Sequence, residues 1–319
     1  MLSSVGRDAE KGRELLYKTL AGAGAAQRLR ALERDGVLIS VIPELASLRG
    51  VGQPREHFWD VFDHSVETVA AVEQVLELAM PSGRDRGALA IPALFNLGGH
   101  LQRQIEAPWD RRTLLKLAAL LHDVAKPATK SIQADGRIRF FHHARQGAAM
   151  AETIMTRLGF TWSATYLVCT LVRYHLRPGQ LGWDPYPTPR ALLRFFRDVG
   201  EAVPDLLILN LADHLAMRGP LLEPDDWEGH LRAVGYILGQ YAQSLEERTA
   251  VALVNGHDLM AALGISPGPQ VGALLRAIQA AHSAGEISTR EEALEMAARL
   301  LHRGDISSEE SARETEVLE

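Results

Sequence analysis

Helical periodicity is the feature that most constrains the fold of this chain. Apolar side chains recur every three to four residues along most of its 319 residues, the spacing of a helix that buries one face. Alternating runs of Val, Ile and Thr between turn dipeptides, which mark β-strands, are almost absent. The segment QADGRIRFF (133–141) favours a short hairpin or an extended loop around Asp135-Gly136. The sequence therefore predicts an all-α protein.

Pro and Gly clusters divide this periodic sequence into segments of helical length. Clear breaks fall at Gly50–Pro54, Pro178–Pro189 and Pro267–Pro269. Between such breaks the sequence predicts helices over residues 9–20, 24–35, 61–79, 111–124, 144–158, 163–175, 189–198, 204–217, 226–246, 256–263, 269–283 and 289–301.

Pauses in the pattern indicate four parts. We expect a short N-terminal helical segment, a main helical bundle, a small C-terminal helical domain and a flexible acidic tail, over residues 1–50, 51–250, 251–302 and 303–319. Residues 81–108 are rich in Gly and Pro, so we expect an insertion between core helices there.

The composition is that of a globular protein, with 46% hydrophobic and 23% charged residues. No apolar run reaches the length of a membrane-spanning helix, and the first residues lack the apolar region of a signal peptide. The single Cys169 excludes an intramolecular disulfide. A cytoplasmic protein without a membrane partner is the simplest interpretation.

The charge is unevenly distributed along the chain. Residues 111–197 hold 14 Lys and Arg against four Asp and Glu, a balance of +10 within a net charge of −6, so the remainder carries −16. This segregation indicates a basic zone that meets an anion. Solvated Arg-rich helix faces are the alternative.

A histidine and an aspartate stand side by side in LLHDVAKPATK (120–130), at the end of an apolar helix. The dipeptide alone is not specific, because His257-Asp258 repeats it. Further residues of the same two types lie at the ends of other helices or beside them, namely His64, His143, His175 and Asp213. An ionisable group next to strongly apolar sequence is costly unless it is paired or bound to a metal. Imidazole and carboxylate ligands from several helices of a bundle suit divalent ions.

This ordered set resembles the HD-domain superfamily of metal-dependent phosphohydrolases. More closely, residues 8–302 resemble the neck, HD and C-terminal regions of bacterial tRNA nucleotidyltransferases (CCA-adding enzymes) and their poly(A) polymerase relatives. The resemblance implies an HD-domain helical bundle with a neck-like N-terminal segment and a small C-terminal domain. Its stretches are VIPELASLRGVGQ (41–53), FDHSVETV (62–69), LLHDVAKPATK (120–130), GRIRFFHHARQGA (136–148), LVRYHLRPGQL (171–181), LADHLAMRG (211–219), LVNGHDLMAALGISPGP (253–269) and GEISTREEAL (285–294).

The resemblance also implies a ligand set for one or two divalent ions, which could be Mn, Fe, Ni, Co or Mg. Asp123 would bridge the two ions and take part in catalysis. By resemblance, one ion would be held by His64, His122, Asp123 and Asp213, and the other by Asp123, His143 and His175. Such ions activate a water and neutralise charge on a phosphoryl group.

Lys126 lies one helical turn beyond His122 and would place an ammonium beside the phosphate, as a second catalytic residue. The alternative is a cation that interacts with the helix dipole. Four arginines of the basic zone would bind the phosphate more loosely: Arg139, Arg145, Arg173 and Arg177.

Three residues compete with this assignment. His142 could replace its neighbour His143 as a ligand, although the match GRIRFF-x-H favours His143. Asp258 is expected to be a helix N-cap. His214 is expected only to neighbour Asp213.

The family's nucleotidyl-transferring head carries a Gly-Ser motif and an Asp-x-Asp pair that holds Mg²⁺, and neither occurs in this sequence. We therefore expect a headless relative, or one half of a split enzyme.

The leading prediction is a phosphohydrolase or phosphodiesterase that acts on a phosphorylated small molecule or an RNA end, such as a nucleotide or a 2′,3′-cyclic phosphate. An RNA-binding subunit that grips tRNA and pairs with a separate nucleotidyltransferase subunit is the alternative. A nucleotide-sensing regulator is the third interpretation.

Overall fold

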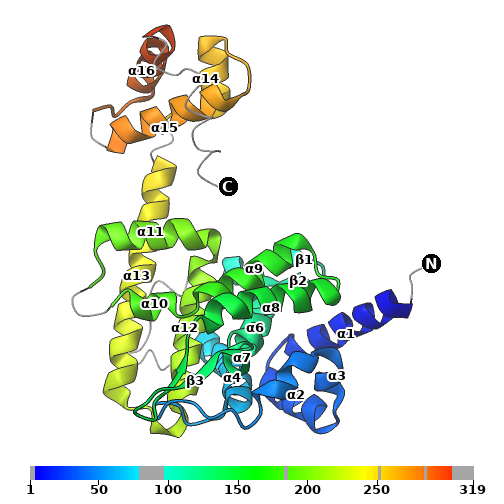
Figure 1. Cartoon of the computed structure of the whole chain (residues 1–319). Helices are drawn as coiled ribbons and strands as arrows, with labels where there is room; N and C mark the ends of the chain where they lie inside the picture. Colours follow the sequence, from blue (N-terminus) through cyan, green and yellow to red (C-terminus); the bar gives the residue numbers. More distant parts are fainter. Residues whose placement is uncertain (1–3, 79–96, 183–185, 251–252, 284–285, 304–319) are drawn as a thin grey trace. The chain divides into compact units, whose positions relative to one another are not determined.

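The computed structural model describes residues 4–78, 97–182, 186–250, 253–283 and 286–303, and these residues are mostly helical (Figure 1). The all-α prediction is confirmed. The chain forms two compact units, Met1–Tyr241 and Ala242–Glu319, and their boundary lies within one long helix, α13. None of the helices among the described residues is both long and apolar enough to cross a bilayer.

The first unit contains sixteen helical elements among its described residues, of which three are 3₁₀ helices (η). They are α1 (Ser4–Leu20), α2 (Ala25–Arg34), α3 (Val37–Val41), η1 (Pro43–Leu48), α4 (Val61–Leu78), α5 (Gly98–Gln102), α6 (Arg111–Leu121), α7 (Lys126–Thr129), α8 (His143–Arg157), α9 (Trp162–Tyr174), α10 (Arg177–Gln180), α11 (Pro189–Val199), η3 (Gly200–Ala202), α12 (Val203–Arg218), η4 (Gly219–Leu221) and α13 (Pro224–Ala250), whose last residues belong to the second unit.

Each of the twelve expected helices is present, with ends shifted by a few residues. The short elements α3, α5, α7 and α10 and the 3₁₀ turns were not expected, because four or five residues are too few to show a period. Of the expected insertion, residues 79–96 lie outside the described residues, as does the acidic tail from residue 304.

Two small antiparallel sheets join the helices. The segment with the hairpin signal does form a hairpin: β3 (Lys130–Ile132) pairs with β4 (Ile138–Phe140), and Gly136 takes a left-handed φ of 79° in the turn. A second pair, β1 (Gln104–Glu106) with β2 (Trp109–Asp110), was not expected, since its strands are only three and two residues long.

Side-chain caps fix where three of the helices begin. Asp110 accepts hydrogen bonds from the backbone N–H and the hydroxyl of Thr113 at the start of α6, at 2.8 and 2.6 Å. Thr161 and Thr188 accept from the N–H three residues later at the starts of α9 and α11. Such caps satisfy N–H groups that have no partner within the helix. They fix the residue at which α6 and α9 begin, and therefore the position of the residues at the C-terminal ends of these helices.

The core of the first unit is a helical bundle. α12 packs against α4, α6 packs against α4 and α9, and α8 packs against α9 (Figure 1). α12 is apolar all round, and every residue from Val203 to Ala212 is buried. A helix of this kind must be enclosed by other helices, and burial decreases just after Ala212, where Asp213, His214 and Leu215 are partly buried.

Lys116 of α6 ties the N-terminal helices to this bundle. Its ammonium donates to the carbonyls of Leu20 and Gly22 at 3.1 and 2.5 Å, and to Glu73 of α4 at 2.7 Å. The Glu73 carboxylate also accepts from the N–H groups of Gly24 and Ala25 at the start of α2. An ion pair that is buried at Lys116 and partly buried at Glu73 thus caps the end of α1 and the beginning of α2 together.

A second buried ion pair joins α6 to α12. The Arg111 guanidinium contacts the Asp205 carboxylate through Nε at 3.1 Å and Nη2 at 2.6 Å, and His100 Nε2 lies 2.7 Å from the same carboxylate. Asp205 is fully buried and Arg111 nearly so. The two-pronged geometry is the one in which an arginine satisfies a carboxylate best.

The second unit has its own small core. Leu259 of α14 (Gly256–Leu263), Leu274 of α15 (Pro269–Ser283) and Ala293 of α16 (Arg290–Arg303) are fully buried within it. The N-cap of α14 is Asn255, so the assignment of this position to Asp258 was wrong. Asp258 is the third residue of a capping box and accepts from the N–H of Asn255.

Candidate metal centre

Five helices bring all six ligand-type residues to one place in the first unit. His64 lies in the first turn of α4, and Asp213 lies on α12 just after its fully buried part. The others stand at helix ends: His122 and His175 directly follow α6 and α9, Asp123 comes next to His122, and His143 begins α8.

One group consists of His64, His122 and Asp213. His64 Nε2 lies 3.2 Å from His122 Nε2 and 3.0 Å from Asp213 Oδ1. Two ligands bound at about 2.1 Å from one ion lie roughly 3.0 to 3.4 Å apart. These separations therefore fit a single metal ion.

The other group consists of Asp123, His143 and His175. His143 Nε2 and His175 Nε2 are 3.3 Å apart, and they lie 3.4 and 3.7 Å from Asp123 Oδ1. The second carboxylate oxygen, Oδ2, lies 3.1 Å from His122 Nε2 and 3.5 Å from His64 Nε2. Asp123 thus turns one oxygen toward each group, which is the arrangement of a bridging ligand.

Backbone hydrogen bonds fix the orientation of three of these imidazoles. The Nδ1 atoms of His122, His143 and His175 lie 2.7 to 2.8 Å from the carbonyls of Ala119, Phe140 and Val172. An Nδ1–H that donates to a carbonyl leaves a lone pair on Nε2, the usual state of a metal-binding histidine. The lone pairs of two Nε2 atoms about 3.3 Å apart repel each other unless a cation lies between them.

The Asp123 carboxylate is the clearest sign that protein atoms alone do not complete this centre. Asp123 is 1% exposed, and neither of its oxygens accepts a hydrogen bond from the described residues. Lys126 Nζ approaches Oδ2 to 2.6 Å, but outside hydrogen-bonding geometry. A buried carboxylate without hydrogen bonds is costly, and a divalent cation would satisfy both oxygens.

The ionisation states also suit a cation. Burial lowers the pKa of His64 and His143, and that of His175 to about 3, so these imidazoles are neutral and able to bind a metal. Burial acts against ionisation of Asp123, but His122 and Lys126 outweigh it and hold the Asp123 pKa well below its usual range. In His122 the effect of burial is outweighed by Asp123, which together with Asp213 raises the pKa to about 10. A metal ion would displace that proton.

Two residues of the loop before α4 complete the surroundings, and sequence reasoning missed both. Gln53 Oε1 accepts a hydrogen bond from Lys126 Nζ at 2.6 Å. The His57 ring meets the His64 ring edge-on at 5.6 Å, and burial lowers the His57 pKa to about 4. Gln53 falls within a stretch that carried the resemblance, but nothing in the sequence distinguished the amide from its neighbours.

The five residues predicted to contact phosphate differ in their position relative to the centre. Lys126 is 6% exposed and lies directly at the centre, beside Asp123. Arg139 and Arg145 are exposed, on β4 and on the first turn of α8. Arg177 pairs with Asp198 at 3.3 Å, and Arg173 lies near the Tyr174 ring. The phosphate-binding role of these four arginines stays a prediction.

The choice between the two neighbouring histidines is clear from their burial. His142 is exposed and adopts a left-handed φ of 62° before α8, whereas His143 is buried and directed at His175. The turn at His142 is what points the next side chain inward.

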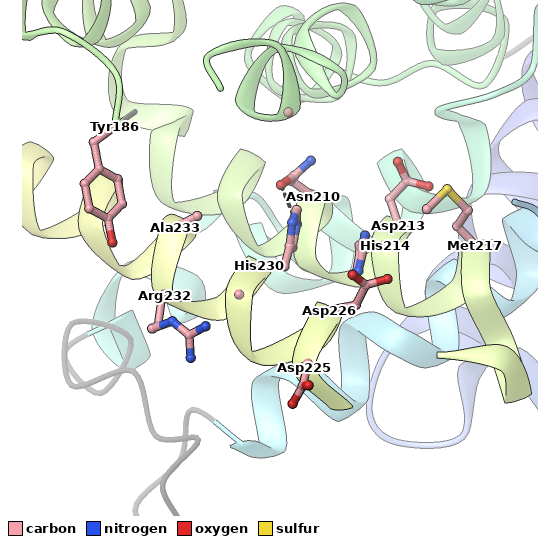
Figure 2. A pocket seen from close by; sticks show the side chains of 12 residues that line it. Tyr186, Asn210, Asp213, His214, Met217, Asp225, Asp226, His230, Arg232 and Ala233 are labelled. Atoms are coloured by element: carbon pink, nitrogen blue, oxygen red, sulfur yellow. Dashed lines mark hydrogen bonds between the residues drawn. The ribbon is translucent and has the colours of Figure 1, made fainter. Parts of the chain in front are cut away.

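A pocket of about 560 Å³ adjoins the centre and shares Asp213 with it. It is lined by residues of α10, α12 and α13, and Figure 2 shows His230 of α13 next to Asn210 of α12 and Asp226 of α13 next to His214 of α12. His214, which we expected only to neighbour Asp213, lines this pocket and stacks on His230 with ring centroids 4.2 Å apart. Sequence reasoning also missed His230. Burial lowers the pKa of this histidine to about 4.

Comparison with known proteins gives two family matches. Residues 61–218, which contain all six ligand-type residues, match the HD domain. Residues 237–298 match tRNA nucleotidyltransferase domain 2.

Three related proteins show the extent of the similarity. A CC-adding tRNA nucleotidyltransferase of Thermus thermophilus is 35% identical over 287 residues, which are 89% of this chain and 55% of that protein. An A-adding tRNA nucleotidyltransferase of Deinococcus radiodurans is 34% identical over 287 residues, 89% of this chain and 56% of that protein. A bifunctional uridylyltransferase/uridylyl-removing enzyme of Rhodopseudomonas palustris is 25% identical over 224 residues, 70% of this chain and 21% of that enzyme. The chain spans about half the length of the two tRNA nucleotidyltransferases.

Proposed function

The chain belongs to the HD-domain family, with a tRNA nucleotidyltransferase domain following the HD domain, and from that premise we propose that it is a divalent-metal-dependent phosphohydrolase. Its substrate is a nucleotide or a 2′,3′-cyclic phosphate, free or at the end of an RNA. The observation that carries the proposal is the Asp123 carboxylate. It is buried and ionised, lies between two groups of imidazoles, and accepts no hydrogen bond from the described residues.

The six ligand-type residues of the centre form two metal-binding sites that share Asp123. When bound, divalent ions lower the pKa of water and neutralise charge on phosphoryl oxygens. His64, His122 and Asp213 form one binding site and His143 and His175 the other, and Asp123 belongs to both.

Lys126 acts on the substrate itself. Gln53 and Asp123 hold its ammonium in place, at 2.6 Å each. A cation fixed in this way would attract a phosphate and orient it against the centre.

The test is hydrolysis by the purified protein loaded with Mn²⁺, Ni²⁺ or Co²⁺. We expect release of phosphate or opening of a cyclic phosphate within a panel of nucleoside 2′,3′-cyclic phosphates and 2′-, 3′- and 5′-monophosphates. The Asp123→Ala variant should lose this activity. Asp258→Ala is the matched control, because it changes the other His-Asp dipeptide, which lies in the second unit.

Two outcomes would end this proposal. One is a metal-loaded protein that hydrolyses no member of the panel. The other is fewer than one bound ion per chain after loading, measured by elemental analysis.

A second proposal is binding of tRNA, alone or with a separate nucleotidyltransferase subunit. It is supported by the similarity over 89% of the chain to proteins named as tRNA nucleotidyltransferases. The basic zone of residues 111–197 would supply phosphate contacts. Both proposals place the protein in the cytoplasm.

The two proposals differ in what Asp123 contributes. Binding of tRNA predicts a mobility shift that weakens with salt and survives Asp123→Ala. A protein that fails to shift tRNA even at low salt would leave only the hydrolytic proposal.

A further inference from the structure

Helix α11 has an apolar face and a basic face. Its buried side consists of four apolar residues, Leu192, Phe195, Phe196 and Val199. Its exposed side carries three arginines at intervals of four and three residues, Arg190, Arg194 and Arg197. Residues three or four apart in a helix lie on the same face. These arginines, here called the arginine row, therefore extend for about 10 Å along the helix axis.

The arginine row lacks the acidic partners that other exposed helix positions have. On α13, Arg232 pairs with Glu228, one turn earlier on the same helix, at 3.5 Å. On α11, Arg197 contacts Asp198, but neither Arg190 nor Arg194 forms an ion pair with the described residues. Like charges one turn apart repel each other and weaken a helix. A bound anion would remove this repulsion.

The position of Arg190 is unfavourable for the same reason. Arg190 lies in the first turn of α11, and that turn contains no acidic residue. The N-terminus of a helix carries a partial positive charge, which disfavours a cation and attracts an anion. On α13, by contrast, the first turn contains Asp225 and Asp226. The start of α11 is therefore suited to a phosphate in two ways, through the helix terminus and through the arginine.

The last turn of α11 connects the arginine row to the metal centre. Asp198 Oδ1 lies 2.9 Å from Arg197 Nη2, and Asp198 Oδ2 lies 3.3 Å from Arg177 Nη2. One carboxylate thus joins two guanidinium groups, and the three side chains together keep a positive charge. Arg177 begins α10, two residues after His175 of the metal centre.

The arginine row therefore has a direction. Arg190 lies at its far end, and Arg197 lies at the end that meets α10. Gly179 of α10 lines the same pocket as Asp213, so this pocket leads from the metal centre toward α10. An extended ligand that follows the arginine row from Arg190 to Arg197 would reach the centre with its end.

The chemistry of the arginine row fits the backbone of a nucleic acid strand. Phosphates repeat along such a strand, and guanidinium groups bind phosphate oxygens through paired N–H donors. An acidic protein is less well matched, because protein interfaces bury an apolar centre and this face offers Leu193 as its one exposed large apolar side chain. The similarity to proteins named as tRNA nucleotidyltransferases favours RNA over DNA.

We propose that the exposed face of α11 binds the backbone of an RNA strand and directs the end of that strand to the metal centre. The substrate of the proposed hydrolysis is then the terminal phosphate of an RNA, and a free nucleotide lacks the contacts with the arginine row. This inference rests on the proposed hydrolysis for the reaction at the strand's end. Binding of the backbone is independent of that reaction.

Three double variants separate the arginine row from net charge. The alanine pair, Arg190→Ala with Arg194→Ala, removes two charges and should preserve α11, since alanine favours a helix. The lysine pair, Arg190→Lys with Arg194→Lys, keeps both charges. The distant pair, Arg7→Ala with Arg34→Ala, removes the same charge from exposed positions on α1 and α2. Figure 1 shows these two helices at the opposite end of the first unit from α11.

The first experiment measures binding of a short single-stranded RNA with a 3′-hydroxyl end, which carries no terminal phosphate to hydrolyse, by fluorescence anisotropy over a range of KCl concentrations. Each phosphate contact contributes about 0.7 to the slope of log K against log salt. The alanine pair should therefore reduce this slope by about 1.4 and raise Kd about tenfold or more, while the lysine pair and the distant pair keep the slope.

Three outcomes of this experiment would overturn the proposal. One is a protein that binds no RNA even at low salt. Another is an alanine pair with the slope and Kd of the unchanged protein. The third is an equal loss in the distant pair, which would show that binding follows net charge rather than the arginine row. Tighter binding of DNA of the same sequence would contradict RNA as the partner.

The second experiment compares an RNA that ends in a 2′,3′-cyclic phosphate with a free nucleoside 2′,3′-cyclic phosphate as substrates of the Mn²⁺-loaded protein. The alanine pair should lower kcat/KM about tenfold or more on the RNA, through KM, and less than about twofold on the nucleotide. An equal effect on both substrates, or none on the RNA, would contradict the role of the arginine row. Hydrolysis of neither substrate, with RNA binding that still depends on the row, would instead refute the proposed reaction alone.

Discussion

Two of the clusters of buried ionisable side chains in the first unit are completed in different ways. At Arg111 and Asp205 each charged group meets its opposite in direct hydrogen bonds. At Asp123 the carboxylate is equally buried, yet its oxygens accept no hydrogen bond from the described residues, and imidazole nitrogens face one another around it. Burial is the same in both clusters. The difference lies in whether protein atoms alone satisfy the charges.

That difference separates structural from functional charge. Removing one partner of a satisfied buried pair leaves the charge of the other partner buried and unpaired, which destabilises the fold. An unsatisfied set, by contrast, is a ready binding site for a cation, and its residues matter for ligand and reaction more than for folding. Four measurements can break or sharpen this contrast, beginning with the largest expected effect.

Replacing Asp123 with Asn should abolish the metal-dependent activity. The amide keeps the shape of the carboxylate but cannot bridge two ions, so kcat/KM should fall by about 10³ or more, or about 4 kcal/mol of transition-state stabilisation. Metal content should fall in parallel. The same change at the other cluster, Asp205→Asn, should leave metal content unchanged in the protein that folds. An Asp123→Asn variant with full metal content would break the contrast.

Truncating Arg111 to Ala should act on stability instead. Among the described residues it leaves the buried Asp205 carboxylate with His100 as its remaining hydrogen-bond partner, and the expected cost is about 3 to 5 kcal/mol in the free energy of unfolding. Denaturant titration at pH 7 measures it. Ion stoichiometry in the folded variant should equal that of the unchanged protein, and a loss of metal without a loss of stability would contradict the structural role of the pair.

Removing the metal should also lower stability, through ligand linkage. At a free metal concentration 100 times its Kd, a bound ion stabilises the folded state by about 2.7 kcal/mol. Chelation should therefore lower Tm in the unchanged protein and in Asp205→Asn, but not in Asp123→Asn. The contrast would fail if chelation shifted Tm equally in all three.

The smallest expected effect concerns the pH dependence of the Lys116–Glu73 pair. Burial raises the pKa of Glu73, but Lys116 and the N–H groups of Ala25 and Gly24 outweigh it, so the folded-state pKa lies below the usual value. The stabilisation is then present above the usual pKa and lost as pH falls through the lowered one. Glu73→Gln should reduce the loss of unfolding free energy between about pH 5 and pH 3, as denaturant titrations at both values would measure. An unchanged pH slope would contradict it.

The helices and the six ligand-type residues can both be predicted from the sequence because both depend on local pattern, namely apolar periodicity and the residue types at or beside helix ends. Periodicity marks α6 and α9, and their ends carry His122 and His175. The arrangement of Asp123, with one oxygen toward each group, follows from how five helices cross and is visible only in three dimensions.

What the sequence did not predict depends on tertiary contacts or on very short segments. Gln53 and His57 lie in a loop with no period, so their place beside Lys126 and His64 has no local signal. Arg111 and Asp205 are 94 residues apart, and the sequence around each residue gives no indication that the other is its partner. At α14 the error was of another kind, because Asn255 and Asp258 are both residues that favour helix starts and only the backbone decides between them.

The contact of Lys116 with the corner between α1 and α2 also bears on the order in which the chain acquires its structure during synthesis. The carbonyl of Leu20 and the ammonium that it meets are 96 residues apart. Closing so long a loop has a substantial entropic cost, and the partner does not exist until α6 has left the ribosome. Until then the corner lacks its ammonium, although α4 emerges earlier and supplies Glu73 to the start of α2, and a nascent chain that is stalled before Lys116 should leave this corner more open to proteolysis.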